Sequence, residues 1–219
     1  LWDKMSVDRV DHFVANSRTV QQRINKFYRR ESEVIYPPVE LKSCSLQKMD
    51  NYYAAGGRLV GYKRFDLIVK AFNRLKWPIK IFGAGPELNS LKKIAKNNIE
   101  FLGQISDEAK GQLLSGARAF IHPQLEDFGI TAVEAMACGR PVIAYSQGGA
   151  VETVLPNETG VFFHKQTWES LLDKLLHFNY ENWDSGRIRA HANKFSAEIF
   201  KNNIKKLIED RYEEFKKGF

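Results

Sequence analysis

The stretch FIHPQLEDFGITAVEAMACGRPV, residues 120–142, constrains the fold of this chain more than any other. An apolar run is followed by a polar loop, by an apolar segment with helical spacing, and by Gly139 and Pro141, after which a second apolar run begins at Val142. That order predicts a strand, a helix and a second strand. Two strands joined through a helix lie parallel in one sheet, with a right-handed crossover.

The same alternation runs through most of the chain. Strands are predicted at residues 52–60, 79–82, 99–102, 119–122, 142–145 and 161–163, and helices at residues 66–75, 86–96, 107–115, from about 130, 151–155 and 168–178. This pattern is typical of βαβ units, so we predict an α/β fold, a Rossmann-like parallel sheet with helices on both faces. The loops that follow the strands then gather at one edge of the sheet, where such proteins bind ligands.

The first of these loops, GGRLVGYK at residues 56–63, combines glycines with two long cationic side chains. Glycine allows the backbone to approach a ligand closely, and Arg58 and Lys63 offer charge for phosphate groups. The loop is not a Walker P-loop, because no Gly-Lys-Ser/Thr follows. A purely structural role for the two cations is the alternative.

The second glycine loop, at Gly83 and Gly85, lacks the third glycine that a dinucleotide fingerprint needs, because Leu88 stands at that position. The sequence therefore disfavours an NAD site.

The loop at residues 123–129 carries Glu126, and the helix that begins near Gly129 and Ile130 carries Glu134. We expect both carboxylates to face one small volume above the start of the helix. Backbone amides at a helix start bind phosphate, whereas glutamates accept hydrogen bonds from sugar hydroxyls. The pattern indicates a sugar-phosphate ligand, although Glu134 as a solvated helix residue is the alternative.

The composition is that of a soluble globular protein with anionic partners. Among the 219 residues, 43% are hydrophobic, and the net charge is +7. This charge favours nucleotides, phospholipid headgroups or nucleic acid. Basic residues are densest in a predicted C-terminal helix capped by Ser196, which allows peripheral membrane association; no nucleic-acid recognition motif accompanies them. Because the chain starts with Leu1 rather than Met, we expect a piece of a longer polypeptide, and we see no secretory signal at its start.

The two cysteines, Cys44 and Cys138, are far apart in the sequence and belong to no Cys-x-x-Cys motif. We therefore predict neither a disulfide framework nor a zinc site, and a reducing cytoplasm as the natural compartment.

Four stretches together resemble the retaining glycosyltransferases of family 4, which have the GT-B fold. They are GRLVGYKRFDLIVKAF, IFGAGPELNSLKKIA with IEFLGQIS, HPQLEDFGITAVEAMACGRPVIAY, and GGAVETVLPNETGVFF. The resemblance covers roughly residues 34–178, and four motifs in order are more specific than any one of them. The third stretch is most similar to mannosyltransferases that build O-antigen or other surface polysaccharides from GDP-mannose.

The resemblance implies transfer of a sugar, mannose from GDP-mannose, to a glycan or a lipid-linked saccharide at the cytoplasmic face of a membrane. It implies no cofactor other than this nucleotide-sugar donor. Because the sequence has no Asp-x-Asp motif and no His/Asp cluster, we also predict that no metal ion is required. Arg58 and Lys63 would contact the diphosphate and Glu126 the sugar hydroxyls, as the catalytic residues. The remaining donor-binding residues would be Gly57, Gly83, Gly85, Gln104, Ile105, Phe128, Gly129, Ile130 and Glu134, the last of them on the ribose.

The same resemblance divides the chain into three parts. Residues 1–33 would be the remnant of an N-terminal acceptor-side domain that is otherwise missing, residues 34–180 the donor-binding domain, and residues 181–219 a helical segment that packs back on the missing domain. The polar segment at residues 40–51 is predicted to be mobile and to lie near the boundary between the domains. Gly61 stands where many family members have proline, which makes the phosphate loop less rigid.

Three other functions remain open. A GT-B relative of another reaction, such as a nucleotide-sugar epimerase, shares the fold without the pattern of Glu126 and Glu134. A non-catalytic lobe would bind the donor without turnover. A DNA or membrane adaptor would depend on charge alone, and its binding would disappear at moderate salt.

Overall fold

The structure is a computed structural model that describes residues 5–40, 44 and 48–217. Its central sheet consists of six parallel strands, β3 (Tyr53–Gly56), β4 (Ile79–Phe82), β5 (Ile99–Gly103), β6 (Phe120–His122), β7 (Val142–Tyr145) and β8 (Gly160–Phe163). The order across the sheet is β5-β4-β3-β6-β7-β8. The chain therefore builds outward from β3 to β5 and then returns to place β6 on the other side of β3. The predicted parallel α/β sheet is confirmed.

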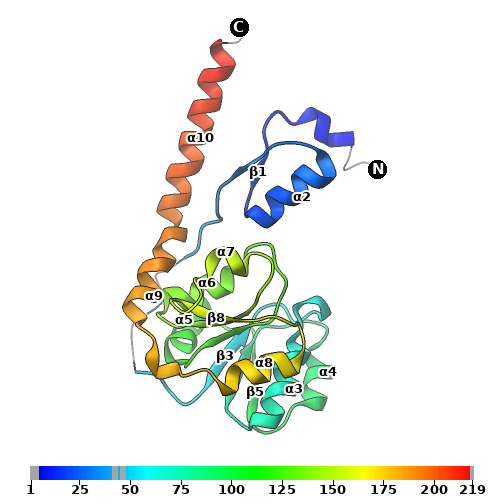
Figure 1. Ribbon diagram of the computed structural model, residues 1–219, viewed down its shortest axis with the longest axis vertical. Coiled ribbons are helices and arrows are strands. Elements are labelled where there is room, and N and C mark those ends of the chain that lie inside the picture. The colour runs from blue at the N-terminus through cyan, green and yellow to red at the C-terminus, as the bar shows by residue number, and fades with distance from the viewer. Residues whose placement is uncertain (1–4, 41–43, 45–47, 218–219) are drawn as a thin grey trace.

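Helices cover both faces of this sheet (Figure 1). One face carries α3 (Phe65–Leu75), α4 (Leu88–Ile94) and α8 (Trp168–Leu176), and the other carries α5 (Asp107–Gly116), α6 (Ile130–Ala137), α7 (Ala150–Thr153) and α9 (Ser185–Ala192). Neighbouring strand residues alternate between the two cores: Ala54 and Phe120 pack on the α6 side, Tyr53 and Ile121 on the α3 side. Burial on both faces explains why the central strands β3, β6 and β7 are buried along their whole length.

A small βαβ unit precedes the sheet. It consists of β1 (Val14–Ala15), α2 (Arg18–Tyr28) and β2 (Glu33–Val34), with the two strands parallel. Ser17 caps α2 by accepting a hydrogen bond from the backbone N–H of Val20. Short 3-10 helices complete the chain: η1 (Val7–Arg9), η2 (Gly61–Lys63), η3 (Tyr180–Asn182) and η4 (Asn193–Phe195). The assignment of residues 1–33 to a second domain stays a prediction.

The last helix, α10 (Ala197–Lys217), extends away from the sheet beside the small unit (Figure 1). Arg211 forms an ion pair there with Glu33 of β2. The helix carries six basic and five acidic side chains, and several are paired within it, such as Lys205 with Glu209. Its charge is therefore nearly balanced, which weakens the argument for membrane association from this helix. Among the described residues, no helix has the length and apolar composition that crossing a bilayer requires.

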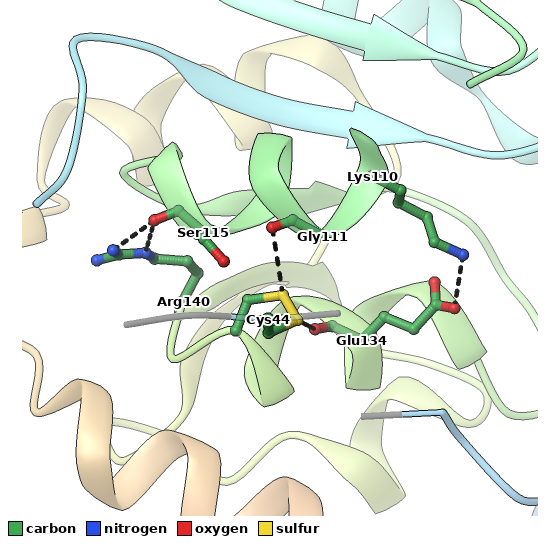
Figure 2. The surroundings of a disulfide bond; sticks show 7 residues. Cys44, Lys110, Gly111, Ser115, Glu134 and Arg140 are labelled. Carbon is green, nitrogen blue, oxygen red and sulfur yellow. Dashed lines mark hydrogen bonds and ion pairs between the residues drawn. A yellow bond between two sulfur atoms is a disulfide. The ribbon is translucent and has the colours of Figure 1, made fainter. Parts of the chain in front are cut away.

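Cys44 and Cys138 form a disulfide bond, so the prediction against disulfide bonding is wrong (Figure 2). Their Cα atoms lie 4.8 Å apart although the residues are 94 positions apart in the sequence. Local spacing could not indicate this bond, because it is the fold that brings Cys44 to Cys138 at the end of α6. The bond removes the basis for predicting a reducing compartment. Residues 41–43 and 45–47 of the predicted mobile segment lie outside the described residues.

Candidate functional site

The strand order places a switch point between β3 and β6. The loop after β3 and the loop after β6 leave neighbouring strands at the same edge of the sheet, while their chains turn in opposite directions. A crevice forms at such a point, and open α/β sheets bind ligands there. The two loops that meet are the glycine loop with Lys63 and the acidic loop with Glu126, both of which the sequence singles out.

Lys63 and Glu126 form an ion pair in this crevice. Nζ of Lys63 lies 2.6 Å from Oε1 of Glu126, and the two side chains are only 17% and 18% exposed. Lys63 ends η2, and its ammonium lies above Gly57, where a Cβ would come 3.5 Å from Nζ. Gly57 has a φ of +136°, a conformation that side chains disfavour. The glycine therefore leaves room around the ammonium.

A cavity of about 560 Å³ opens beside the ion pair. Its lining residues are Asn16, Arg23, Pro37, Tyr62, Lys63, Leu125, Glu126, Asp127, Phe128, Gly129, Ile130 and Thr131. It thus brings together the predicted residues Lys63, Glu126, Phe128, Gly129 and Ile130. Its volume is in the range typical of small-molecule sites.

The start of α6 forms one wall of this cavity. Gly129 precedes the helix with a φ of +86°, and no side chain caps it. The first backbone N–H groups of a helix have no acceptor inside it and carry partial positive charge. The amides of Ile130 and Thr131, both lining residues, are of this kind. A ligand oxygen with negative charge would find donors there.

Gly83 and Gly85 hold two loops together. A Cβ at Gly83 would come 1.8 Å from the carbonyl oxygen of Gly57, and a Cβ at Gly85 would come 2.2 Å from that of Leu59. Gly83 also donates its N–H to the carbonyl of Gly103, at 2.6 Å. These glycines therefore have a packing role, which keeps the loop of Lys63 against the loop after β4.

Glu134 lines a second cavity, of about 230 Å³, rather than the first. Its Oε1 lies 2.8 Å from Nζ of Lys110 (Figure 2). Lys110 also pairs with Asp107. Burial opposes the charge of Lys110, but the hydrogen bonds to Glu134 and Asp107 outweigh it and raise the pKa of this lysine. Ile130 lines both cavities, so Glu126 and Glu134 face adjoining spaces and not the single volume that spacing suggests.

The remaining predicted residues lie outside both cavities. Arg58 and Gln104 are exposed, and Ile105 packs against the core on the α6 side. Within the described part of the chain, the guanidinium of Arg58 makes no ion pair. It follows β3 in the same loop as Lys63, so it stands at the correct edge of the sheet.

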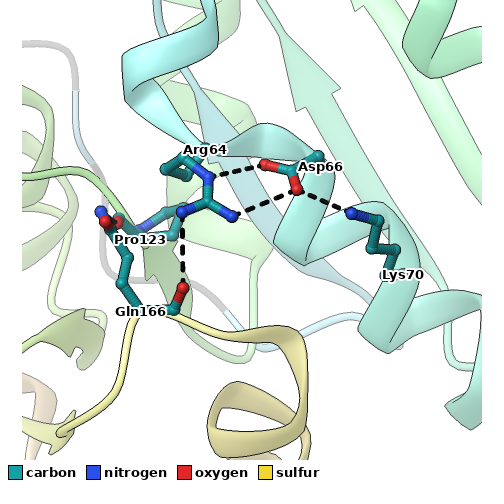
Figure 3. A network of polar contacts seen from close by, with 5 residues as sticks. All are labelled: Arg64, Asp66, Lys70, Pro123 and Gln166. Carbon is teal, nitrogen blue, oxygen red and sulfur yellow. Dashed lines mark hydrogen bonds and ion pairs between the residues drawn. The ribbon is translucent and has the colours of Figure 1, made fainter.

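A polar network that the sequence did not reveal holds three loops of this edge together (Figure 3). Arg64 pairs with Asp66 at 3.0 Å and donates to the carbonyl of Gln166 at 3.4 Å. Gln166 in turn donates its side-chain amide to the carbonyl of Pro123, at 2.9 Å. The network joins the loops after β3, β6 and β8, and thus fixes the backbone on either side of the ion pair.

The small N-terminal unit contributes residues that sequence reasoning missed. Asn16 and Arg23 line the first cavity, and Arg23 pairs with Asp127. The carboxylate of Glu152 accepts hydrogen bonds from the backbone N–H groups of Arg18 and Thr19, at 2.7 and 2.9 Å. The start of α2 is thus held against the sheet domain. Only the tertiary structure could show this, since more than 100 residues separate the partners.

His122 at the end of β6 is another residue of the site that the sequence did not indicate. Its side chain is 1% exposed, and burial lowers its pKa to about 4. The ring is therefore uncharged at neutral pH. Nε2 lies 3.9 Å from Oε2 of Glu126, on the side of the carboxylate away from Lys63.

Comparison with protein families decides the identity of this architecture. The family described as glycosyl transferases group 1 matches residues 40–195, which contain both loops of the ion pair and both cavity glutamates. This chain belongs to the group 1 glycosyl transferases. The predicted resemblance to glycosyltransferases is confirmed.

Two curated relatives illustrate the similarity. The O-antigen chain mannosyltransferase RfbU of Salmonella typhimurium is 34% identical over 156 residues, a match that covers 64% of this chain and 43% of RfbU. A GDP-mannose-dependent phosphatidylinositol monomannoside mannosyltransferase of Corynebacterium glutamicum is 32% identical over 139 residues, covering 56% of this chain and 36% of that protein. The chain spans about half the length of the curated relatives it matches.

Solved structures share the fold. Sucrose-phosphate synthase from Thermosynechococcus elongatus superposes with a TM-score of 0.84 at 22% identity, covering 96% of this chain and 60% of that one. Anabaena HepE, solved with UDP and glucose, gives a TM-score of 0.79 at 19% identity, covering 93% and 64%.

Proposed function

We propose that this chain is the donor-binding half of a retaining glycosyltransferase that moves mannose from GDP-mannose to a glycan or a lipid-linked saccharide. The observation that carries the proposal is the half-buried pair of Lys63 and Glu126, which stands beside the start of α6 at the switch point of the sheet. The names of the relatives with 32–34% identity support mannose as the sugar. The identity of the donor's base is tested by the calorimetric titration described below.

In this proposal the phosphates bind at Lys63 and at the amides of Ile130 and Thr131. An ammonium and helix-terminal N–H groups are both suited to phosphate oxygens. Lys63 would break its ion pair with Glu126 and bind the diphosphate, because the diphosphate carries at least two negative charges and the carboxylate only one. Arg58, exposed in the same loop, would reach the same anion from the solvent side.

The two glutamates would bind the hydroxyls of the sugar and of the ribose. Glu126 would accept hydrogen bonds from sugar hydroxyls in the larger cavity, which Phe128 and Gly129 also line. Glu134 would accept from the ribose hydroxyls in the smaller one. The shared wall at Ile130 lets one extended ligand reach both. Gly57, Gly83, Gly85, Gln104 and Ile105 would shape the loops that border the nucleotide.

Catalysis would come from charge stabilisation. Glycosyl transfer passes through an oxocarbenium-like state while negative charge builds on the departing phosphate. Lys63, Arg58 and the helix amides would bind that charge more strongly in the transition state than in the ground state. We propose that no metal ion takes part, because these cations face the phosphate and the sequence has no Asp-x-Asp motif. Activity retained in EDTA would support this, and activity lost and restored by manganese would refute it.

The acceptor would enter from the side of the small N-terminal unit. Asn16 and Arg23 line the larger cavity together with Glu126 and could contact an incoming hydroxyl or its neighbouring groups. An N-terminal domain would complete this side, with the enzyme on the cytoplasmic face of a membrane when the acceptor is lipid-linked. The anomeric configuration of the product, read by NMR, tests retention.

Calorimetric titration with GDP, UDP, ADP and GDP-mannose tests the donor. The proposal expects GDP and GDP-mannose to bind at least tenfold more tightly than UDP and ADP. Comparable affinity for UDP would refute the assignment of GDP-mannose. Binding of GDP-mannose without any transfer by the full-length protein would favour a non-catalytic lobe, and an epimerised sugar among the products would favour an epimerase.

A further inference from the structure

His122 carries a buried imidazole that no described residue satisfies. The side chain is 1% exposed, and neither Nδ1 nor Nε2 has a hydrogen-bond partner within the described part of the chain. Buried polar atoms in native proteins are nearly always paired. A polar group left without a partner at the edge of a ligand cavity indicates a contact that forms in another state of the site.

The carboxylate of Glu126 is a neighbouring group that could supply this contact. Its Oε1 is held by Lys63 at 2.6 Å, whereas its Oε2 lies 3.9 Å from Nε2 of His122, beyond hydrogen-bond range. The carboxylate therefore stands between a cation that it contacts and an imidazole that it does not. A shift of about 1 Å would bring Oε2 within hydrogen-bond distance of Nε2.

Gly129 keeps this space free. A Cβ at position 129 would come 3.1 Å from Nε2 of His122, and the residue has a φ of +86°. A larger residue would press on the ring and would be strained itself. Glycine at position 129 thus leaves the space beside Nε2 free of a side chain.

The uncharged imidazole of His122 is suited to donate a hydrogen bond close to the ammonium of Lys63. Burial lowers the pKa of His122 to about 4, the charge of Glu126 opposes this effect, and the charge of Lys63 adds to it. At neutral pH the ring can donate one N–H without bringing a second positive charge next to Lys63. Among the described residues, Glu126 and Lys63 are the charged groups that shift the pKa of the ring.

We propose that His122 is a positioning residue that takes over Glu126 when the donor's phosphates draw Lys63 away. Its Nε2–H then donates to Oε2 and holds the carboxylate where it can accept from the sugar. Only hydrogen bonds are exchanged, and the proton stays on Nε2. The proposal deepens the proposed function, since the anion that attracts Lys63 is the donor's diphosphate.

The first test needs no nucleotide. Lys63→Ala removes the competing ammonium, so Glu126 should turn to His122 in the free protein. In spectra of protein with ¹⁵N-labelled histidine, the Nε2–H proton of His122 should move downfield and exchange more slowly with water than in the wild type. The missing signal of His122→Gln assigns the resonance. Identical His122 spectra in wild type and Lys63→Ala would overturn the proposal, whether or not any nucleotide binds.

The second test separates positioning from packing. Glutamine places its amide nitrogen near the position of Nε2, whereas asparagine places it near Nδ1. We expect His122→Gln to keep the affinity for GDP-mannose within about threefold of the wild type and His122→Asn to weaken it about tenfold, with GDP affinity unchanged in both. Equal losses in the two variants would overturn the proposal. If wild type binds no nucleotide sugar, the proposed function fails, and the free-protein spectra still decide the role of His122.

Discussion

Nζ of Lys63 lies 2.6 Å from Oε1 of Glu126, although the two residues follow different strands. The pair forms because β3 and β6 are neighbours at the point where the strand order turns. Both groups are less than one-fifth exposed, so each is partly desolvated and depends on the other. A ligand that separates them must replace both contacts. In the proposed function a sugar diphosphate would do so, since its phosphates suit the lysine and its hydroxyls suit the glutamate.

Glu126→Gln should reduce the preference for GDP-mannose over GDP. The neutral amide accepts more weakly from hydroxyls, and the change costs about tenfold in affinity for the sugar-bearing ligand. The same substitution frees Lys63 and so should leave GDP binding unchanged or tighter. Calorimetry with both ligands measures the ratio, and the exposed Glu158→Gln is the control. An unchanged ratio would remove Glu126 from the sugar site.

Glu134→Gln should weaken GDP about tenfold but leave 2′,3′-dideoxy-GDP unaffected, because only the former has ribose hydroxyls to donate. Lys110 keeps its second partner, Asp107, at 2.9 Å, so the fold should persist. The exposed Glu108→Gln on the same helix as Lys110 is the matched control. Equal loss for both nucleotides would show that the substitution disturbs the site without a ribose contact.

Acid should destabilise the protein through His122. Its pKa is about 4 in the folded state against 6.5 for the free side chain, so the unfolded state binds the proton more strongly. Stability that is present above pH 6.5 is therefore lost as the pH falls, until the folded-state pKa is reached. At pH 5 the loss is about 2 kcal/mol relative to pH 8. Urea unfolding of wild type and His122→Gln should show this difference, and parallel pH profiles for the two proteins would contradict it.

Reduction of the Cys44–Cys138 bond should lower the free energy of unfolding by about 3–5 kcal/mol, since the bond closes a long loop in the unfolded chain. Unfolding with and without dithiothreitol measures the effect. A variant with both Cys44→Ser and Cys138→Ser is the control, and dithiothreitol should not alter it. If dithiothreitol leaves the free energy of unfolding of the wild type unchanged as well, the bond does not form in solution.

The periodic features of the sequence predicted the fold because they follow from burial. Six apolar runs alternate with helices, and burial of both sheet faces demands that pattern. The same reasoning placed the loops of Lys63 and Glu126 at one edge of the sheet. The contact between the two residues also depends on the strand order, which makes β3 and β6 neighbours and which no local sequence pattern reveals.

Features that depend on tertiary neighbours escaped prediction. Spacing on a helix suggested that Glu134 would share a volume with Glu126, but Lys110 from α5 binds it in an adjoining cavity. The disulfide escaped for the same reason, since its cysteines meet only after the chain has folded. His122 looked like an ordinary strand residue, because burial and the lack of a partner are visible only in three dimensions.

Lys63→Ala tests the central claim, that one pocket binds the donor's phosphates, most directly. Removal of one preorganised donor to a developing charge costs about 3 kcal/mol. Turnover of the full-length enzyme and affinity for the nucleoside diphosphate should therefore each fall at least tenfold. The exposed Lys70→Ala on α3 should leave both unchanged. Turnover and affinity of Lys63→Ala within twofold of the wild type would contradict the account.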